Sequence, residues 1–531
     1  MSSRPDGRPP ATTTEAGVPV ASDEHSLTAG AGGPVLLQDA YLNEKLAHFV
    51  RERIPDRVYH VKGGGAHGYF EVTADVSQWT KAAFLGEVGK RTPLFARFSI
   101  VAAEEGAPDT DRDVRGFAVK LYTEEGNYDI VGNNTPVFFV RDPMKFPDFI
   151  HSQERLPDTG MRSNNMQWDF WTLSPESAHQ VTMLMSDRGT PRSWRHMHGY
   201  ASSTYLWENA AGQKFWVKYH FKTEQGIQNM TDAESRAART GDLDAHRRDL
   251  WDAIARQDYP AWRLEMQIMP FEDAASYRFN PFDLTKVWPQ RDYPPIPVGR
   301  MVLDRNPENF FAQVTQVAFE VSNMVPGIGP SPDRMVLGRM FAYGDSARYR
   351  IGPNYDQLPV NRPVSDVHNY NKDGPMQYEH TGSQPVYAPN SYGGPRADHE
   401  RYADPGWFSP GAEIARTAYE EHKDDDDFIQ AGTLYRDVMS PVDRDHLASN
   451  IVWHLSQGVE RFIQERAVHD YWAKVDPELG ARVARGRGLS RQRRAAAGLA
   501  RASPRRPGGG RAAPRPSRRT GSRRPAGRSR R

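Results

Sequence analysis

The stretch RMFAYGDSA, residues 339–347, places Arg339 four residues before Tyr343 in a segment typical of a helix. Positions i and i+4 share one helix face, so the two side chains are expected to meet. A free tyrosine has a pKa of about 10, and an adjacent cation lowers that pKa. Arginine stays protonated in proteins, so the pair could produce a phenolate, a hard anionic ligand suited to ferric iron. The same spacing is also typical of a stacked surface pair, and the two residues alone leave both interpretations open.

The segment around this pair carries the start and stop signals of a helix. Ser331–Pro332 offers an N-cap followed by a first-turn proline, and Gly352–Pro353 ends the run. On the predicted helix, Arg350 falls near the face of Arg339 and Tyr343. The sequence therefore predicts a helix that presents two cations and a phenol in one direction.

A second group of polar residues lies in a region of alternating hydrophobicity. In PLFARFSIVA, residues 93–102, Arg97 and Ser99 are two positions apart and fall on one face of a predicted strand. Helices interrupt the region at 230–258, but no alternation of strands with helices is present, which favours an antiparallel sheet or barrel. Further strand predictions are a hairpin over 115–132 with its turn at 124–127, and runs at 135–142, 214–223 and 262–270.

Composition narrows the possible chemistry. The 531 residues include no cysteine, which excludes disulfides, iron–sulfur clusters, thiolate-ligated haem and cysteine nucleophiles. The formal net charge is +1, yet residues 485–531 hold 17 arginines and no acidic residue, which leaves −16 for the rest. An acidic body argues against nucleic-acid binding by the folded part. With no long apolar run and no signal peptide, we expect a soluble, cytoplasmic protein without a membrane span.

The chain divides by composition into five parts. We expect an arm whose start is disordered, a β-barrel domain, a long irregular segment that wraps the fold and carries the Tyr343 helix, a C-terminal helical domain, and a disordered arginine-rich tail. The tail is typical of an arm that binds nucleic acid, or of a reading-frame shift in a GC-rich gene. The expected boundaries are 1–55, 56–304, 305–420, 421–484 and 485–531.

Several long motifs together resemble the monofunctional haem catalases of the small-subunit type. They are FVRERIPDRVYHVKGGG, RFSIVAAEEGAPDTDRDVRGFAVK, NYDIVGNNTPVFFVRDPMKFPDFIHSQ, FNPFDLTKVWP and RMFAYGDSA. The resemblance covers roughly residues 33–484 and implies the α+β catalase fold, an antiparallel β-barrel core with an N-terminal arm, a wrapping segment and a C-terminal helical region.

The resemblance also implies a role for each matching residue. His60 and Asn133 match the distal catalytic pair, and Ser99 matches the serine that holds the histidine ring. Tyr343 matches the proximal ligand of the haem iron, a ligand known for catalases in general. The remaining cofactor-binding matches are Arg339, which keeps that tyrosine ionised, Arg57, Arg97 and Arg350 at the propionates, and Phe138 and Phe146 on the distal side.

The implied activity is disproportionation of hydrogen peroxide to water and dioxygen through an oxidised iron-oxo haem, which protects against oxidative stress. The implied cofactor is haem b, and the implied assembly is a homotetramer. NADPH is a further candidate cofactor, because His179, Ser186, Arg188 and Lys222 match its site, whereas Met183, His198 and Gln290 differ. The alternative activity is that of a haem enzyme of the same fold acting on organic or lipid hydroperoxides.

Besides the nucleotide-site differences and a conservative Asp56 where the family usually has Glu, three further residues depart from the family pattern. Tyr59 precedes His60 where a small apolar residue is usual, and it is expected to narrow the pocket or to add a hydrogen bond. Ser203 stands where a histidine often supports the proximal arginine, and Ala347 ends the RMFAYGDSA motif where Gln, Glu or His is common. The Tyr59 departure bears on turnover and leaves the reaction type unchanged, whereas Ser203 and Ala347 imply a shorter proximal hydrogen-bond chain.

Overall fold

The structure is a computed structural model that describes residues 9–379, 382, 385–402 and 425–489. By their contacts, residues up to Arg487 form one unit, and a second unit begins at Gly488. The arginine-rich tail predicted from residue 485 therefore lies almost wholly outside the described residues. No helix in the described ranges is long and apolar enough to cross a bilayer.

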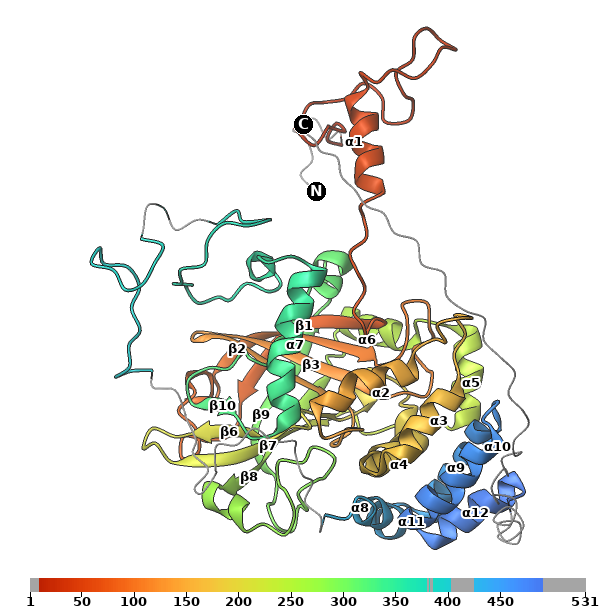
Figure 1. The fold of residues 1–531 in the computed structure, drawn as a ribbon. Helices are drawn as coiled ribbons and strands as arrows, with labels where there is room; N and C mark the ends of the chain where they lie inside the picture. The colour runs from red at the N-terminus through yellow and green to blue at the C-terminus, as the bar shows by residue number, and fades with distance from the viewer. Residues whose placement is uncertain (1–8, 380–381, 383–384, 403–424, 490–531) are drawn as a thin grey trace, which may run out of the picture. The chain divides into compact units, whose positions relative to one another are not determined.

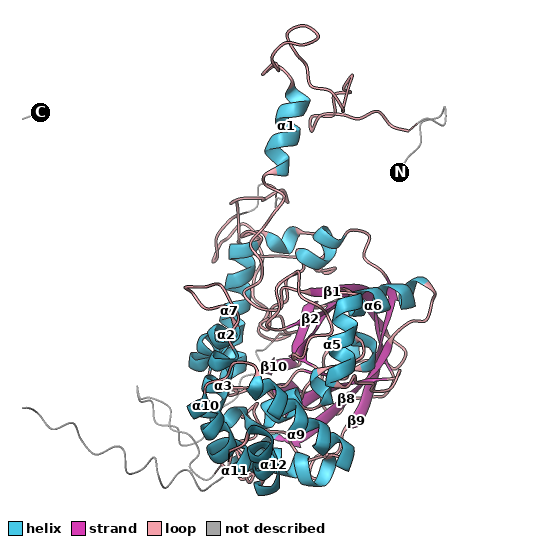
Figure 2. Cartoon of the chain, turned by 90° about the vertical axis from the view of Figure 1, so that its right-hand side faces the viewer, coloured by secondary structure: helices cyan, strands magenta, loops and turns pink. Residues whose placement is uncertain are grey.

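The first unit is built on a closed antiparallel barrel (Figures 1 and 2). Eight strands pair in a ring, because β7 contacts both β5 and β8, and two further strands, β6 and then β10, extend from β7. The predicted antiparallel barrel is confirmed. The strands are β1 (Gly63–Val72), β2 (Arg91–Ile100), β3 (Arg115–Thr123), β4 (Gly126–Asn133), β5 (Gly199–Tyr200), β6 (Tyr205–Glu208), β7 (Lys214–Thr223), β8 (Ala261–Pro270), β9 (Ile296–Arg305) and β10 (Ile328–Pro330).

The predicted hairpin is strands β3 and β4, in which Thr123 faces Gly126 across a two-residue connection. Gly126 has a φ of 124°, which glycine adopts without the strain that a side chain would bring. The predicted strands at 214–223 and 262–270 correspond to β7 and β8. Apolar residues of both strands belong to the hydrophobic core, in which Trp262 of β8 is in ring contact with Phe98 and Phe117.

The strand predicted at residues 135–142 is wrong. The β4 strand ends at Asn133, and the chain then runs irregularly into helix α2 (Phe146–Gln153). Val137, Phe139 and Val140 are all buried, and the Phe139 ring stacks on Phe149 with centroids 4.3 Å apart. The apolar run is therefore buried against helices, and short apolar runs do not distinguish that environment from a buried strand.

Helices cover the barrel and form a C-terminal layer. Helix α7 (Arg334–Arg350) runs alongside the strands, and the helical region predicted at the C-terminus is confirmed (Figure 1). The C-terminal helices contact α3 and α4, where Trp168 Nε1 donates to His454 Nδ1 at 2.9 Å. The other helices are α1 (Ala40–Phe49), α3 (Asn164–Leu173), α4 (Ala178–Met185), α5 (Asp232–Gly241), α6 (Ala245–Ala255), α8 (Ile429–Thr433), α9 (Pro441–Ser456), α10 (Arg461–Arg466), α11 (Ala473–Val475) and α12 (Pro477–Arg487).

Candidate active site

Helix α7 begins two residues later than the sequence suggested. Its N-cap is Asp333, whose carboxylate accepts hydrogen bonds from the amides of Met335 and Val336, and the predicted cap Ser331 instead donates to the carbonyl of Thr204 at 2.6 Å. A carboxylate satisfies two unpaired amides and complements the positive end of the helix dipole, which favours Asp333 over the serine. The corrected cap leaves the faces of α7 as predicted.

The Arg339–Tyr343 pair faces the barrel. Arg339 Nη2 donates to the Tyr343 hydroxyl at 3.1 Å and to the Val131 carbonyl of β4 at 2.7 Å. Burial lowers the pKa of Arg339, but the phenols of Tyr343 and Tyr205 outweigh it and hold that pKa above its ordinary value. The guanidinium is therefore a fixed positive charge against the phenol oxygen. It also lies over the Tyr343 ring, 5.0 Å from its centroid, and the pair borders an internal cavity.

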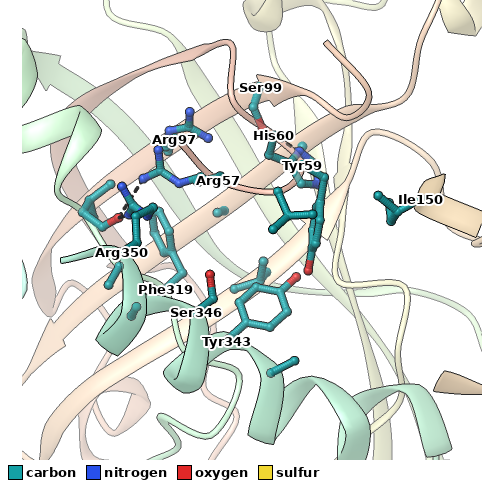
Figure 3. A pocket seen from close by; sticks show the side chains of 18 of the residues that line it. Arg57, Tyr59, His60, Arg97, Ser99, Ile150, Phe319, Tyr343, Ser346 and Arg350 are labelled. Atoms are coloured by element: carbon teal, nitrogen blue, oxygen red, sulfur yellow. Dashed lines mark hydrogen bonds between the residues drawn. The ribbon is translucent and has the colours of Figure 1, made fainter. Parts of the chain in front are cut away.

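Three arginines gather at one end of the adjoining cavity (Figure 3), and we call Arg57, Arg97 and Arg350 the arginine cluster. Arg57 donates to the carbonyls of residues 314, 315 and 317, and Arg350 donates to that of residue 315 at 2.7 Å. Arg97 donates to the Val61 carbonyl at 2.9 Å, while its buried Nε has no partner. Within the described residues, no carboxylate forms an ion pair with any member of the cluster.

The charge of the arginine cluster is only partly offset, because Asp56 and Glu105 act on it without forming an ion pair with any of its members. Burial lowers the pKa of Arg97 to about 9, with Arg350 adding to the shift, and burial lowers the pKa of Arg350 to about 10. Burial and the two other guanidinium groups hold the pKa of Arg57 well below its usual range. Buried cations without counter-ions are costly, so this end of the cavity is suited to a ligand with carboxylate groups, which arginine binds through paired hydrogen bonds.

His60 faces the same cavity from an irregular segment before β1. Its amide donates to the Val101 carbonyl at 2.9 Å, and its ring Nδ1 lies 2.8 Å from Ser99 Oγ. Its φ of 62° is uncommon for a residue with a side chain, and such backbone conformations are concentrated at functional sites. Burial, followed by the charges of Arg97, Arg57 and Arg339, lowers the pKa of His60 to about 3, so the imidazole is neutral and can accept a proton.

Gly116 lies behind the imidazole, and sequence analysis did not identify it. A Cβ on Gly116 would lie 2.6 Å from His60 Nδ1 and closer still to Ser99 Oγ, so a side chain would displace the ring. An isolated glycine inside a predicted strand is the signal for such close approach, but it does not say what approaches. Phe319 and Ile150, which complete the apolar walls in Figure 3, carried no signal in the sequence.

Asn133 and the two phenylalanines border a smaller adjoining cavity of about 40 Å³. Asn133 is the last residue of β4 and is buried beside His60, and the Phe138 and Phe146 rings stack with centroids 5.9 Å apart. The larger cavity, about 350 Å³, holds the arginine cluster, His60 and Tyr343. The structure thus brings all ten predicted site residues to two adjoining cavities.

The donor set fits haem by its chemistry. One end of the cavity presents guanidinium groups for two propionates, one wall presents a phenol paired with a cation, and the opposite wall presents a neutral imidazole. The rest of the lining is predominantly apolar, as Val131, Val317, Phe319 and Ala347 show. Ala347, one of the three departures, lines this cavity directly.

Comparison with known proteins agrees with this geometry. The catalase family profile matches residues 13–394, and a profile named catalase-related immune-responsive matches residues 421–487. A catalase of Methanosarcina barkeri is 55% identical over 89% of this chain and 93% of its own. Catalase-A of Dictyostelium discoideum is 53% identical over 90% of this chain and 97% of its own.

Solved structures give the same result. The structure of a bacterial catalase superposes with a TM-score of 0.87 at 51% identity, covering 92% of this chain and 98% of that one. Catalase A from Saccharomyces cerevisiae superposes with a TM-score of 0.86 at 42% identity, covering 92% of this chain and all of that one. The chain therefore belongs to the catalase family and is an enzyme that decomposes hydrogen peroxide.

Proposed function

We propose that this catalase is of the small-subunit type and works with haem b bound between His60 and Tyr343. One observation supports the proposal. The His60–Ser99 pair and the Arg339–Tyr343 pair face each other across a cavity, and the arginine cluster lies at one end of that cavity. In it, Tyr343 is the proximal iron ligand, and Arg57, Arg97 and Arg350 hold the propionates. When bound, the haem would supply the redox chemistry, with one peroxide as oxidant and a second as reductant.

The protein's own residues position the peroxide and move its proton. The neutral ring of His60 has its Nδ1 engaged with Ser99, which leaves Nε2 to accept a proton from peroxide and return it to the departing oxygen. The Asn133 amide can donate a hydrogen bond to the bound peroxide, and the Phe138 and Phe146 rings exclude water around it. Arg339 holds the Tyr343 oxygen in position through its charged hydrogen bond.

The role of His60 is tested by the variant His60→Ala. We expect the purified variant to keep its haem, because the imidazole does not hold the cofactor, and to lose about 100- to 10,000-fold of its oxygen evolution. An absorption spectrum and an oxygen-electrode trace after adding peroxide measure the two properties separately. As a matched control, His196→Ala removes an exposed imidazole that contacts the Gly226 carbonyl, and it should leave both unchanged. Full activity in His60→Ala would show that another group moves the proton.

The finer features of assembly are also proposals. We infer a cytoplasmic homotetramer that acts in the oxidative stress response, with the parts bounded at 1–55, 56–304, 305–420, 421–484 and 485–531. Helix α1 buries none of its own residues, and Tyr378, Tyr387 and Tyr392 of the irregular segment are exposed, which supports contacts with other subunits. The barrel strands between Gly63 and Arg305 and the helices from Ile429 to Arg487 support the central divisions.

NADPH remains a proposed second cofactor. Lys222 Nζ lies 3.3 Å from the Tyr200 hydroxyl, and the charges of Lys222 and Arg188 both act on His198, which supports a basic cluster at the residues that match the family's nucleotide site. Burial, then Lys222 and Arg188, lower the pKa of His198 to about 3, so this histidine adds no positive charge there. Nucleotide fluorescence in the purified protein would reveal bound NADPH.

A further inference from the structure

Tyr59, one of the three departures from the family pattern, stands between the two cavities of the active site. Both cavities are bordered by Tyr59, His60, Phe146 and Tyr343, so they are two parts of one space. The arginine cluster lies in the larger part, and Asn133 and Phe138 lie in the smaller. Because Tyr59 lies between the two parts, the position of its side chain sets the size of the ligand that the combined space accepts.

The Tyr59 ring crosses from the imidazole toward the phenol. Its centroid lies 5.3 Å from that of His60 and 5.1 Å from that of Phe146, which it meets edge to face. Its hydroxyl points toward the hydroxyl of Tyr343 (Figure 3). Burial, and next the neighbouring Tyr343, hold the pKa of Tyr59 well above its usual value, so the side chain is a neutral phenol.

The backbone on both sides of Tyr59 is held in place. The Arg57 guanidinium donates to the carbonyls of residues 314, 315 and 317, and the His60 amide donates to the Val101 carbonyl. A shift of the whole segment would break these bonds and would move the His60–Ser99 contact as well. The movement available to Tyr59 is therefore a rotation about its own side-chain torsions between staggered rotamers.

We propose that Tyr59 is the residue that determines access of a macrocycle to the space between His60 and Tyr343. A flat tetrapyrrole reaches the Tyr343 oxygen only when the Tyr59 ring turns aside, so the chain takes up haem through a minority conformer. This inference rests on the proposed function, in which haem binds between these two side chains. Minority conformers are typically populated at about 10% or less, and uptake through one is slowed by the same factor.

The test is the rate of haem uptake by the full-length chain purified from haem-limited cells. Haemin is added and the growth of the protein-bound absorption band is followed with time. Tyr59→Val and Tyr59→Leu remove the ring, and we expect uptake at least about tenfold faster than in the wild type. Tyr59→Phe keeps the ring and removes only the hydroxyl, and we expect uptake within about twofold of the wild type. Circular dichroism of each haem-free variant controls for folding, and a variant that misfolds is replaced by the other.

The outcomes separate this inference from the proposed function. Equal uptake rates in the wild type and both ring-removing variants, with haem bound in all, would overturn the role of Tyr59 and leave haem binding intact. Fast uptake in Tyr59→Phe would also overturn it, because the hydroxyl and not the ring would be the barrier. Failure of the wild type and every variant to bind haem would overturn both proposals together.

Discussion

Arg339 and the arginine cluster border the same active site, but their surroundings are opposite. Arg339 donates to the Tyr343 hydroxyl, and the phenols of Tyr343 and Tyr205 hold its pKa above the ordinary value despite burial. In the cluster, burial lowers the pKa of all three guanidinium groups, repulsion within the cluster adds to the shift for Arg57 and Arg97, and none forms an ion pair with a carboxylate within the described residues. The first arginine is satisfied by the protein and acts on Tyr343, whereas the cluster is complete only with an anionic ligand.

The largest expected effect comes from removing the satisfied arginine. Arg339→Gln leaves the Tyr343 hydroxyl without its positively charged hydrogen-bond donor, and we expect oxygen evolution to fall by roughly 100-fold or more. Arg339→Lys keeps a positive charge and should recover part of the loss. Arg300→Gln, which removes an arginine paired with Glu224 outside the active site, is the matched control and should stay within about twofold. Equal activity in Arg339→Gln and Arg300→Gln would refute the role of Arg339.

A change in the arginine cluster is expected to have a smaller effect, which lowers haem affinity and raises the stability of the haem-free chain. Arg97→Gln removes one member, and we expect haem affinity to fall about 10- to 100-fold because a charge-assisted hydrogen bond is lost. The same change relieves repulsion, so the free energy of unfolding of the haem-free chain should rise by on the order of 1 kcal/mol. Haem titration and urea unfolding measure the two effects.

A fall in both haem affinity and the free energy of unfolding would mean that Arg97 stabilises the fold itself. The contrast with Arg339 would then disappear. Arg91→Gln is a suitable control, because Arg91 lies at the other end of β2 and pairs with Glu71 at 2.7 Å on the exposed surface. We expect that variant to change neither haem affinity nor unfolding by a measurable amount.

The smallest effect is expected from pH in the neutral range. The pKa of His60 is lowered to about 3, so its neutral form persists and oxygen evolution should vary less than about twofold between pH 6 and pH 9. A rate that follows a pKa near 6.5 would contradict a buried, neutral His60.

Acidic pH should lower the stability of the fold. Burial likewise lowers the pKa of His220 and His246 to about 3 and of His179 to about 4. A histidine whose pKa is lower in the folded state than in the unfolded state contributes stability at pH values above its unfolded-state pKa of about 6.5. That contribution is lost as the pH falls toward its folded-state pKa. Thermal unfolding midpoints should therefore decline steadily below about pH 6.5.

The sequence predicted well which residues share a face of one helix or strand, and it predicted poorly which residues of different elements meet in the fold. The helical spacing of Arg339 and Tyr343 and the strand spacing of Arg97 and Ser99 follow from fixed periodicities, so both placements could be predicted. The arginine cluster joins a loop, a strand and a helix, and only the family resemblance grouped Arg57 with Arg350. Close packing behind the active site, as at Gly116, and the path of the Tyr59 ring depend on neighbours distant in sequence.

Two predictions were wrong because the sequence allowed two local interactions at each place and did not distinguish between them. Ser331 is a good N-cap residue, but Asp333 satisfies two amides and Ser331 bonds to the Thr204 carbonyl. The apolar run at 135–142 has the composition of a strand, yet its residues are buried by helices α2 and α3, as the stacking of Phe139 on Trp171 shows. Tertiary packing decided both cases.

The central claim is that the Tyr343 phenolate binds the haem iron, and the absorption spectrum of the variant Tyr343→Phe tests it most directly. We expect the variant to retain less haem than the wild type and to show a shifted visible spectrum, because phenylalanine has no oxygen to bind the metal. Tyr122→Phe removes a phenol that donates to the Val360 carbonyl outside the active site and should leave the spectrum unchanged. An unaltered haem content and spectrum in Tyr343→Phe would contradict the account.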